Sequence, residues 1–110
     1  MARRALGTFE LLILLAVMRL EDDAYGVPIS REIEETSGHG VAIATVYATL
    51  ERLEERGLVT SELGDPTPER GGRAKRIFRV TNKGVRDVQD ARRALTRLWG
   101  RLPQLKGEPS

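Results

Sequence analysis

Hydrophobic residues recur at helical spacing in four stretches of the chain, which predicts four helices. Thr8 and Thr81 are suitable N-caps for the first and the last of them. Pro28 suits the first turn of the second helix, after a connection at Tyr25-Gly26, and Gly57 suits the end of the third. The first stretch is apolar almost all round, which is typical of a helix buried on several sides. The predicted helices cover residues 8–20, 28–37, 44–56 and 82–102.

Two stretches of alternating polar and apolar residues predict a β-hairpin before the last helix. They are residues 58–63 and 75–81, where Phe78 and Val80 alternate with their neighbours. The connection, residues 64–73, exceeds the roughly two to five residues usual in hairpins, and long loops in compact domains are often functional. The order of elements is that of a winged helix-turn-helix, a mainly α fold with a small β-hairpin.

The last predicted helix carries a narrow apolar seam with heptad spacing. The residues between the seam positions are mostly charged, so the seam needs another surface to cover it. It could fold back on its own domain, or pair with its copy or with helix 8–20 of a partner subunit, and we expect a homodimer. Residues 103–110 are expected to form a disordered tail. The expected dimerisation residues are Leu12, Leu15, Val88, Ala91, Leu95, Leu98 and Leu102.

Composition and motifs argue against several classes of function. The chain has 110 residues, enough for one domain, and no cysteine, which excludes disulfides and thiolate chemistry. The single histidine, His39, lacks partners at metal-ligand spacing, and no nucleophile–base pair or phosphate-binding glycine loop is present, so we expect no enzyme, metal or cofactor. The apolar run 11–18 is too short to span a bilayer, and the acidic residues after it disfavour a signal peptide. We expect a cytoplasmic protein.

Charge distribution points to a polyanionic partner. The net charge is only +2, but the stretch 70–80 contains basic residues and no acidic one. Such a local strip indicates that a polyanion meets one face, although a merely solvated hairpin would show the same charges. The basic residues of this strip are Arg70, Arg73, Lys75, Arg76 and Arg79.

The third helix and the hairpin together suggest a DNA-binding surface. A short amphipathic helix can pack one face on its neighbours and place the other in the major groove, where its N-terminal residues approach base edges. Tyr47 could instead be a core aromatic, and Arg52 could pair with neighbouring glutamates. The expected DNA-contacting residues are Thr45, Tyr47, Ala48, Thr49, Arg52, Arg73, Lys75 and Arg76.

Several separated motifs resemble PadR-type transcriptional regulators. The run 44–59 resembles their recognition helix and first wing strand, and 71–84 resembles the rest of the wing. Tyr25-Gly26 and the leading stretch 6–10 match in type and order, so the resemblance covers residues 6–102. The chain departs from the family pattern at Ala42, where a polar cap is usual, and at Ile43-Ala44, where glycine is common.

The resemblance implies a homodimeric repressor that binds a palindromic operator in double-stranded DNA. It implies that Tyr47 contacts a phosphate or a base edge and that the basic residues of the wing contact phosphates. The chain looks like the short form, with residues 1–81 as the DNA-binding domain and 82–102 as the dimerisation helix. Some short members hold flat aromatic ligands between tryptophans, which implies a planar aromatic inducer near Trp99, although tryptophan there can simply pack an interface.

Two alternatives to a DNA-reading repressor remain open. One is a winged-helix protein-interaction module that does not read DNA, motivated by the acidic residues of the second and third helices and by the scarcity of bidentate base readers. The other is a dimer that sequesters a small molecule. Charge reversal in the wing separates the first alternative from DNA binding.

Overall fold

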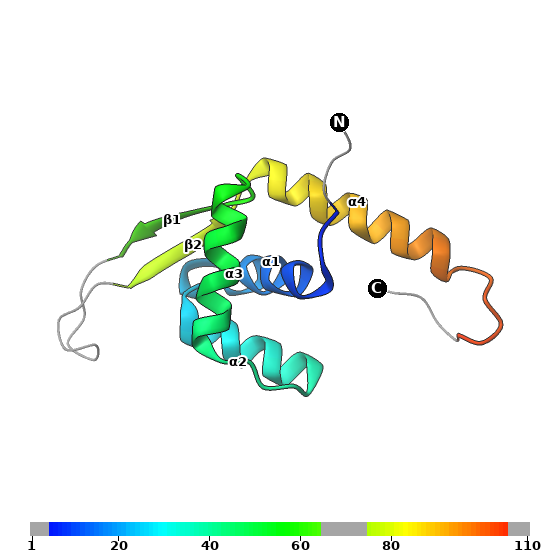
Figure 1. Cartoon of the computed structure of the whole chain (residues 1–110), viewed down its shortest axis with the longest axis horizontal. Coiled ribbons are helices and arrows are strands. Elements are labelled where there is room, and N and C mark those ends of the chain that lie inside the picture. Colours follow the sequence, from blue (N-terminus) through cyan, green and yellow to red (C-terminus); the bar gives the residue numbers. More distant parts are fainter. Residues whose placement is uncertain (1–4, 65–74, 106–110) are drawn as a thin grey trace.

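The computed structural model describes residues 5–64 and 75–105. Three helices come first, a two-stranded hairpin follows, and a long helix ends the fold (Figure 1). This order confirms the winged helix-turn-helix. Within the described ranges, no helix is long and apolar enough to cross a membrane. The elements are α1 (Thr8–Leu20), the 3-10 turn η1 (Glu21–Asp23), α2 (Gly26–Ser37), α3 (Ile43–Glu55), β1 (Val59–Leu63), β2 (Arg76–Val80) and α4 (Asn82–Trp99).

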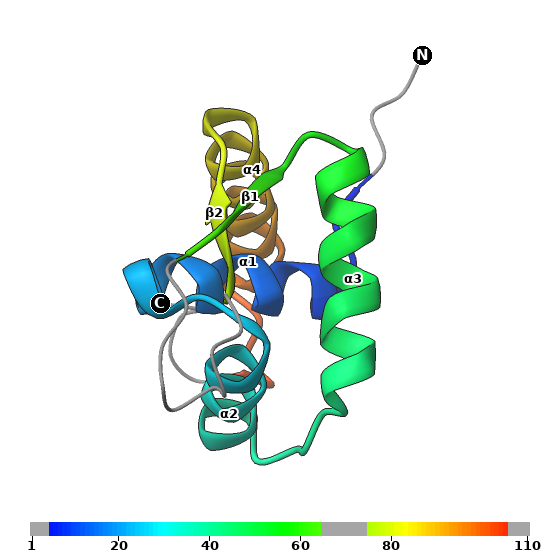
Figure 2. The ribbon, with the colours of Figure 1, turned by 90° about the vertical axis from the view of Figure 1, so that its left-hand side faces the viewer.

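Helix α1 is the centre of the fold, as its apolar character predicts. It lies between α4 on one side and α2 on the other (Figures 1 and 2). Four of its apolar side chains are buried, and the core that they begin includes residues from α2, α3 and both strands. The largest fully buried side chains of this core are Ile13, Leu14, Ile29, Leu50, Leu53, Leu58 and Phe78.

The hairpin is antiparallel and is fixed to the helices at its base. Val59 pairs with Val80 at the base, and Leu63 pairs with Arg76 at the far end. The Phe78 N–H donates to the carbonyl of Ala24 at 2.8 Å, which joins β2 to the segment before α2. The hairpin is therefore attached to the segment before α2, and its strands contact α1 and α3.

The N-terminus of α1 is capped differently from the prediction. Gly7, not Thr8, is the N-cap, and its N–H donates to Glu10 Oε1 at 2.8 Å. Arg56 Nη1 donates to both oxygens of the same carboxylate, at 3.3 and 3.2 Å. Because both side chains are mostly buried, this ion pair ties α1 firmly to the C-terminal end of α3.

The C-terminus of α3 ends as its glycine predicts and is joined to α4. Gly57 has φ +77°, and the N–H groups of Gly57 and Leu58 bond back to carbonyls of the last turn in a Schellman motif. Thr81 Oγ1 donates to the Gly57 carbonyl at 2.7 Å, and Lys83 Nζ donates to that of Arg56 at 3.0 Å. The beginning of α4 thus completes the hydrogen bonding at the end of α3.

Helix α4 begins as predicted but ends earlier. Thr81 is its N-cap and accepts from the Gly84 N–H at 3.1 Å. The helix ends at Trp99 instead of residue 102, because Gly100 adopts an extended conformation with ψ 140°. Leu102, predicted to lie on the seam of this helix, therefore lies beyond it.

Candidate nucleic-acid interface

Helix α3 has one buried face and one exposed face. Val46, Leu50 and Leu53 are completely buried against the other helices. Thr45 and Ala48, in the N-terminal half, are exposed. Figure 2 shows that α3 lies at the edge of the fold, with no other element along its outer side. These two expected DNA-contacting residues therefore lie where a major groove could receive them.

Thr49 corrects the predicted set of DNA contacts. It lies one helical turn after Val46 and one before Leu53, so it belongs to the buried face, and its exposed fraction is 0%. Arg52 Nη2 donates to Thr49 Oγ1 at 3.2 Å, while the Arg52 residue remains exposed. Arg52 thus lies at the surface, and Thr49 is part of the buried interior.

Tyr47 lies at the boundary between core and surface. Its ring is half-buried and packs against Phe78 of β2, with ring centroids 6.3 Å apart and planes tilted by 56°. On the α2 side, the outer end of the ring lies against Gly26. The ring therefore packs on the core, while the side chain still reaches the surface, and a DNA contact by Tyr47 stays a prediction.

The wing brings basic residues to the α2 and α3 side of the molecule. Lys75 Nζ lies 4.9 Å from the centroid of the ring of Tyr25, which is the residue immediately before Gly26 in the chain. Arg76 is exposed, and its Nη1 donates to Ser61 Oγ of β1 at 2.9 Å. Arg73, the third basic residue expected to contact DNA from the wing, lies outside the described residues.

Arg79 belongs to the basic strip but is engaged within the chain. Its Nη2 donates to Asp22 of η1 at 2.8 Å, and its Nε lies 3.7 Å from Glu62 Oε1. The hydrogen bond and the charge of Asp22 raise the pKa of the Arg79 guanidinium above its ordinary value. Arg79 therefore links the hairpin to η1 at the base of the wing.

The seam of α4 is divided between the core and the surface. Val88 packs against the core of its own chain, and Ala91 is half-buried. Leu95 and Leu98 are 44% and 75% exposed. The seam thus folds back on its own domain in the first half of α4, while the second half presents uncovered leucines.

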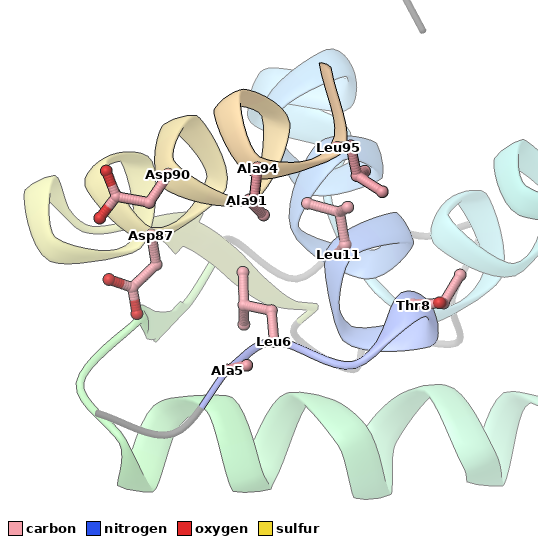
Figure 3. A pocket seen from close by; sticks show the side chains of 9 residues that line it. All are labelled: Ala5, Leu6, Thr8, Leu11, Asp87, Asp90, Ala91, Ala94 and Leu95. Carbon is pink, nitrogen blue, oxygen red and sulfur yellow. The ribbon is translucent and has the colours of Figure 1, made fainter. Parts of the chain in front are cut away.

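Two hollows lie beside α1. One, of about 480 Å³, lies between the N-terminal segment and α4; Figure 3 shows Leu6 and Leu11 on the opposite side from Ala91 and Leu95. The other, of about 630 Å³, lies between α1 and α2 and is lined by Leu12 and Leu15 among others. All the expected dimerisation residues of α1 therefore border a hollow.

Trp99 ends α4 with a half-buried side chain. Its indole Nε1 is buried and has no hydrogen-bond partner among the described residues. An indole N–H in that position is usually hydrogen-bonded. Within residues 5–64 and 75–105, this donor therefore has no acceptor, and it lies next to the exposed leucines of the seam.

A comparison with protein families accounts for this arrangement. The sequence model described as "Transcriptional regulator PadR-like family" matches residues 14–90, more than half of the chain. The chain belongs to the PadR-like family of transcriptional regulators. The PadR resemblance and the expectation of a regulator instead of an enzyme are thus confirmed.

Individual relatives agree with this membership. The PadR-like chain is 35% identical to transcriptional regulator Rv3488 of Mycobacterium tuberculosis over 78 residues, which are 71% of this chain and 68% of that protein. The structure of a PadR-like regulator from Bacillus cereus matches with a TM-score of 0.73 at 20% identity, over 93% of this chain and 95% of that one. A PadR family regulator from Clostridium difficile matches with a TM-score of 0.70 at 23% identity, over 89% and 97%. These two structures support the fold.

Sequence reasoning missed two features of this PadR-like chain that hold the site in place. The ion pair of Glu10 with Arg56 joins residues 46 positions apart, and no local pattern signals such a pair. The sequence predicts Gly26 to be part of a connection, whereas it is the first residue of α2 and lies under the Tyr47 ring. A glycine at the start of a helical pattern was the only available signal.

Proposed function

We propose that this PadR-like regulator is a cytoplasmic homodimeric repressor that binds a palindromic operator in double-stranded DNA. Each subunit inserts the exposed N-terminal half of α3 into a major groove, and the wing contacts phosphates. The observation that carries the proposal is a chain of contacts: Lys75 lies over Tyr25, and the next residue, Gly26, lies under Tyr47. Recognition helix and wing thus offer Thr45, Ala48, Arg52, Tyr47, Lys75 and Arg76 on neighbouring surfaces.

The dimer is proposed to form through the uncovered part of the α4 seam together with α1. Leu95, Leu98 and Leu15 are exposed leucines on these helices, and the two hollows beside α1 can receive side chains of a second copy. Burial of such a surface is favourable roughly in proportion to its apolar area. A two-fold dimer then presents two α3 helices to half-sites about one helical turn apart.

The first experiment is a titration with DNA. We expect tight binding to the duplex upstream of the protein's own gene, weak binding to a scrambled duplex, and a loss of affinity as salt rises, because phosphate contacts release counterions. Equal binding to both duplexes, or none, contradicts operator recognition at that locus and favours the protein-interaction alternative.

Charge reversal in the wing tests which surface meets DNA. The double variant Lys75→Glu/Arg76→Glu is expected to lose at least about tenfold in operator affinity, since hydrogen bonds to charged groups contribute about 1.5–3 kcal/mol each. Arg97→Glu is the control, because Arg97 is exposed in the last turn of α4 and its spacing puts it opposite the seam. This end of α4 lies away from α3 (Figure 1). Unchanged affinity of the wing variant, or an equal loss in the control, argues against a wing contact.

We further propose that a planar aromatic small molecule acts as inducer by contacting Trp99. The buried indole N–H without a partner among the described residues supports a site that a ligand completes. Trp99 is the only tryptophan, so its fluorescence reports on this position alone. We expect saturable quenching by members of a panel of planar aromatic compounds, together with weaker operator binding. No response across the panel argues against a ligand at Trp99.

A further inference from the structure

Gly26 occupies a helical position that does not require glycine for its backbone. It is the first residue of α2, and the described glycines with positive φ are Gly38 and Gly57 only. In an ordinary helical conformation alanine is the better residue, because glycine loses more backbone freedom. The reason for a glycine here therefore lies in the space around it.

That space is filled by the ring of Tyr47. A Cβ atom at Gly26 would lie 2.6 Å from Tyr47 Oη, 2.6 Å from Cε2 and 2.7 Å from Cζ. These distances are far below van der Waals contact, which begins near 3.5 Å between carbon atoms. Only the absence of a side chain at Gly26 allows the outer end of the Tyr47 ring to rest on the first turn of α2.

The rest of the structure limits where this ring could go if it were displaced. Phe78, which is 2% exposed, packs against the ring from β2. A methyl group on Gly26 would therefore push the ring end away from α2 instead of deeper into the core. The Tyr47 hydroxyl makes no hydrogen bond with any described residue that would hold it back.

We propose that Gly26 is a positioning residue: it sets the place of the Tyr47 hydroxyl, so that this group donates to a DNA phosphate beside Lys75. The inference rests on the proposed function and deepens it, because it names the residue that positions one of the proposed DNA-contacting groups. Gly26 itself touches no DNA in this proposal. The two adjacent residues Tyr25 and Gly26 thus each contact one of these side chains: the Tyr25 ring lies under Lys75, and Gly26 lies under Tyr47.

A double-mutant cycle on operator affinity tests this role. Tyr47→Phe and Gly26→Ala are each expected to weaken operator binding about tenfold, the value of one hydrogen bond to a charged group. Because both changes remove the same contact, the double variant is expected to lose about tenfold as well, instead of a hundredfold. Losses that multiply, or no loss in Gly26→Ala, overturn the proposal. Gly7→Ala, whose Cβ would make only an ordinary 3.5 Å contact with Glu10 Oε1, is the control.

A second cycle on stability keeps the test decisive if Gly26→Ala folds poorly. Gly26→Ala is expected to lower the urea midpoint in the wild-type background but not in a Tyr47→Ala background, where no ring opposes the methyl group. An equal decrease in both backgrounds contradicts the close packing. If the wild-type protein shows no preference for operator DNA, the proposed function fails and the positioning role falls with it, whereas the stability cycle still reports on the packing.

Discussion

The double variant Leu95→Asp/Leu98→Asp is expected to be a folded monomer that binds operator DNA at least about a hundredfold more weakly than the wild type. The two leucines are 44% and 75% exposed in the single chain, so their replacement removes little from the core. Each contributes about 1.5–3 kcal/mol when it is fully buried in a partner interface. Aspartate in the same place would also have to bury a charge without a counter-ion, which opposes association further.

The loss of DNA affinity follows from the loss of the second recognition helix. In a dimer, once one α3 is bound, the other meets its half-site at a high effective concentration, and a monomer loses this gain. Sedimentation equilibrium measures the mass of the assembly. We expect twice the chain mass of 12.2 kDa for the wild type and that mass alone for the variant. Urea unfolding checks that the monomer remains folded.

A matched control separates the seam from α4 as a whole. Gln89 and Thr96 are exposed on the opposite side of the helix from Leu95 and Leu98. Gln89→Asp/Thr96→Asp adds the same charge to the same helix and is expected to leave the dimer intact. If this control dissociates equally, net charge is the cause; if the leucine variant remains dimeric, the interface lies elsewhere.

The sequence predicts well those features that depend on residues close together in the chain. The cap at Thr81, the glycine end of α3 and the buried α1 all follow from local rules, and the structure has them. The heptad seam also follows from spacing, although spacing alone does not say that Val88 would pack on its own core while Leu98 stays exposed.

The mistaken or missing parts depend on contacts between distant segments or on the width of a buried face. Thr49 has the spacing of the buried face of α3, but it is polar, so the hydrophobic pattern does not include it; the neighbours packed around α3 make this face wide enough to bury it. The α4 helix stops at Gly100, although its apolar spacing continues to Leu102. Gly26 and Tyr47 are 21 positions apart, and only the fold reveals that one makes room for the other.

The largest loss of stability from a small change is expected for Gly84→Ala. Gly84 lies in the first turn of α4, where alanine is ordinarily the better helix former by about 1 kcal/mol. A Cβ atom here would overlap the Leu58 carbonyl oxygen and lie 2.6 Å from Val80 Cγ1 and 3.2 Å from the Leu58 carbonyl carbon. Backbone atoms cannot move aside as a flexible side chain can, so the α4 helix itself would have to shift.

Such a shift would disturb the junction between α3 and α4. The same Leu58 carbonyl accepts from the Thr81 N–H at 3.0 Å, and Thr81 also bonds to the Gly57 carbonyl at the end of α3. We expect Gly84→Ala to lower the free energy of unfolding by about 2–4 kcal/mol, a large share of the 5–15 kcal/mol typical of a domain. Gly40→Ala, whose nearest contact would be an ordinary 3.7 Å from Glu34 Oε2, is expected to change it little. Urea unfolding of both variants provides the measurement, and a Gly84→Ala protein as stable as the wild type would show that α3 and α4 are not held together at this point.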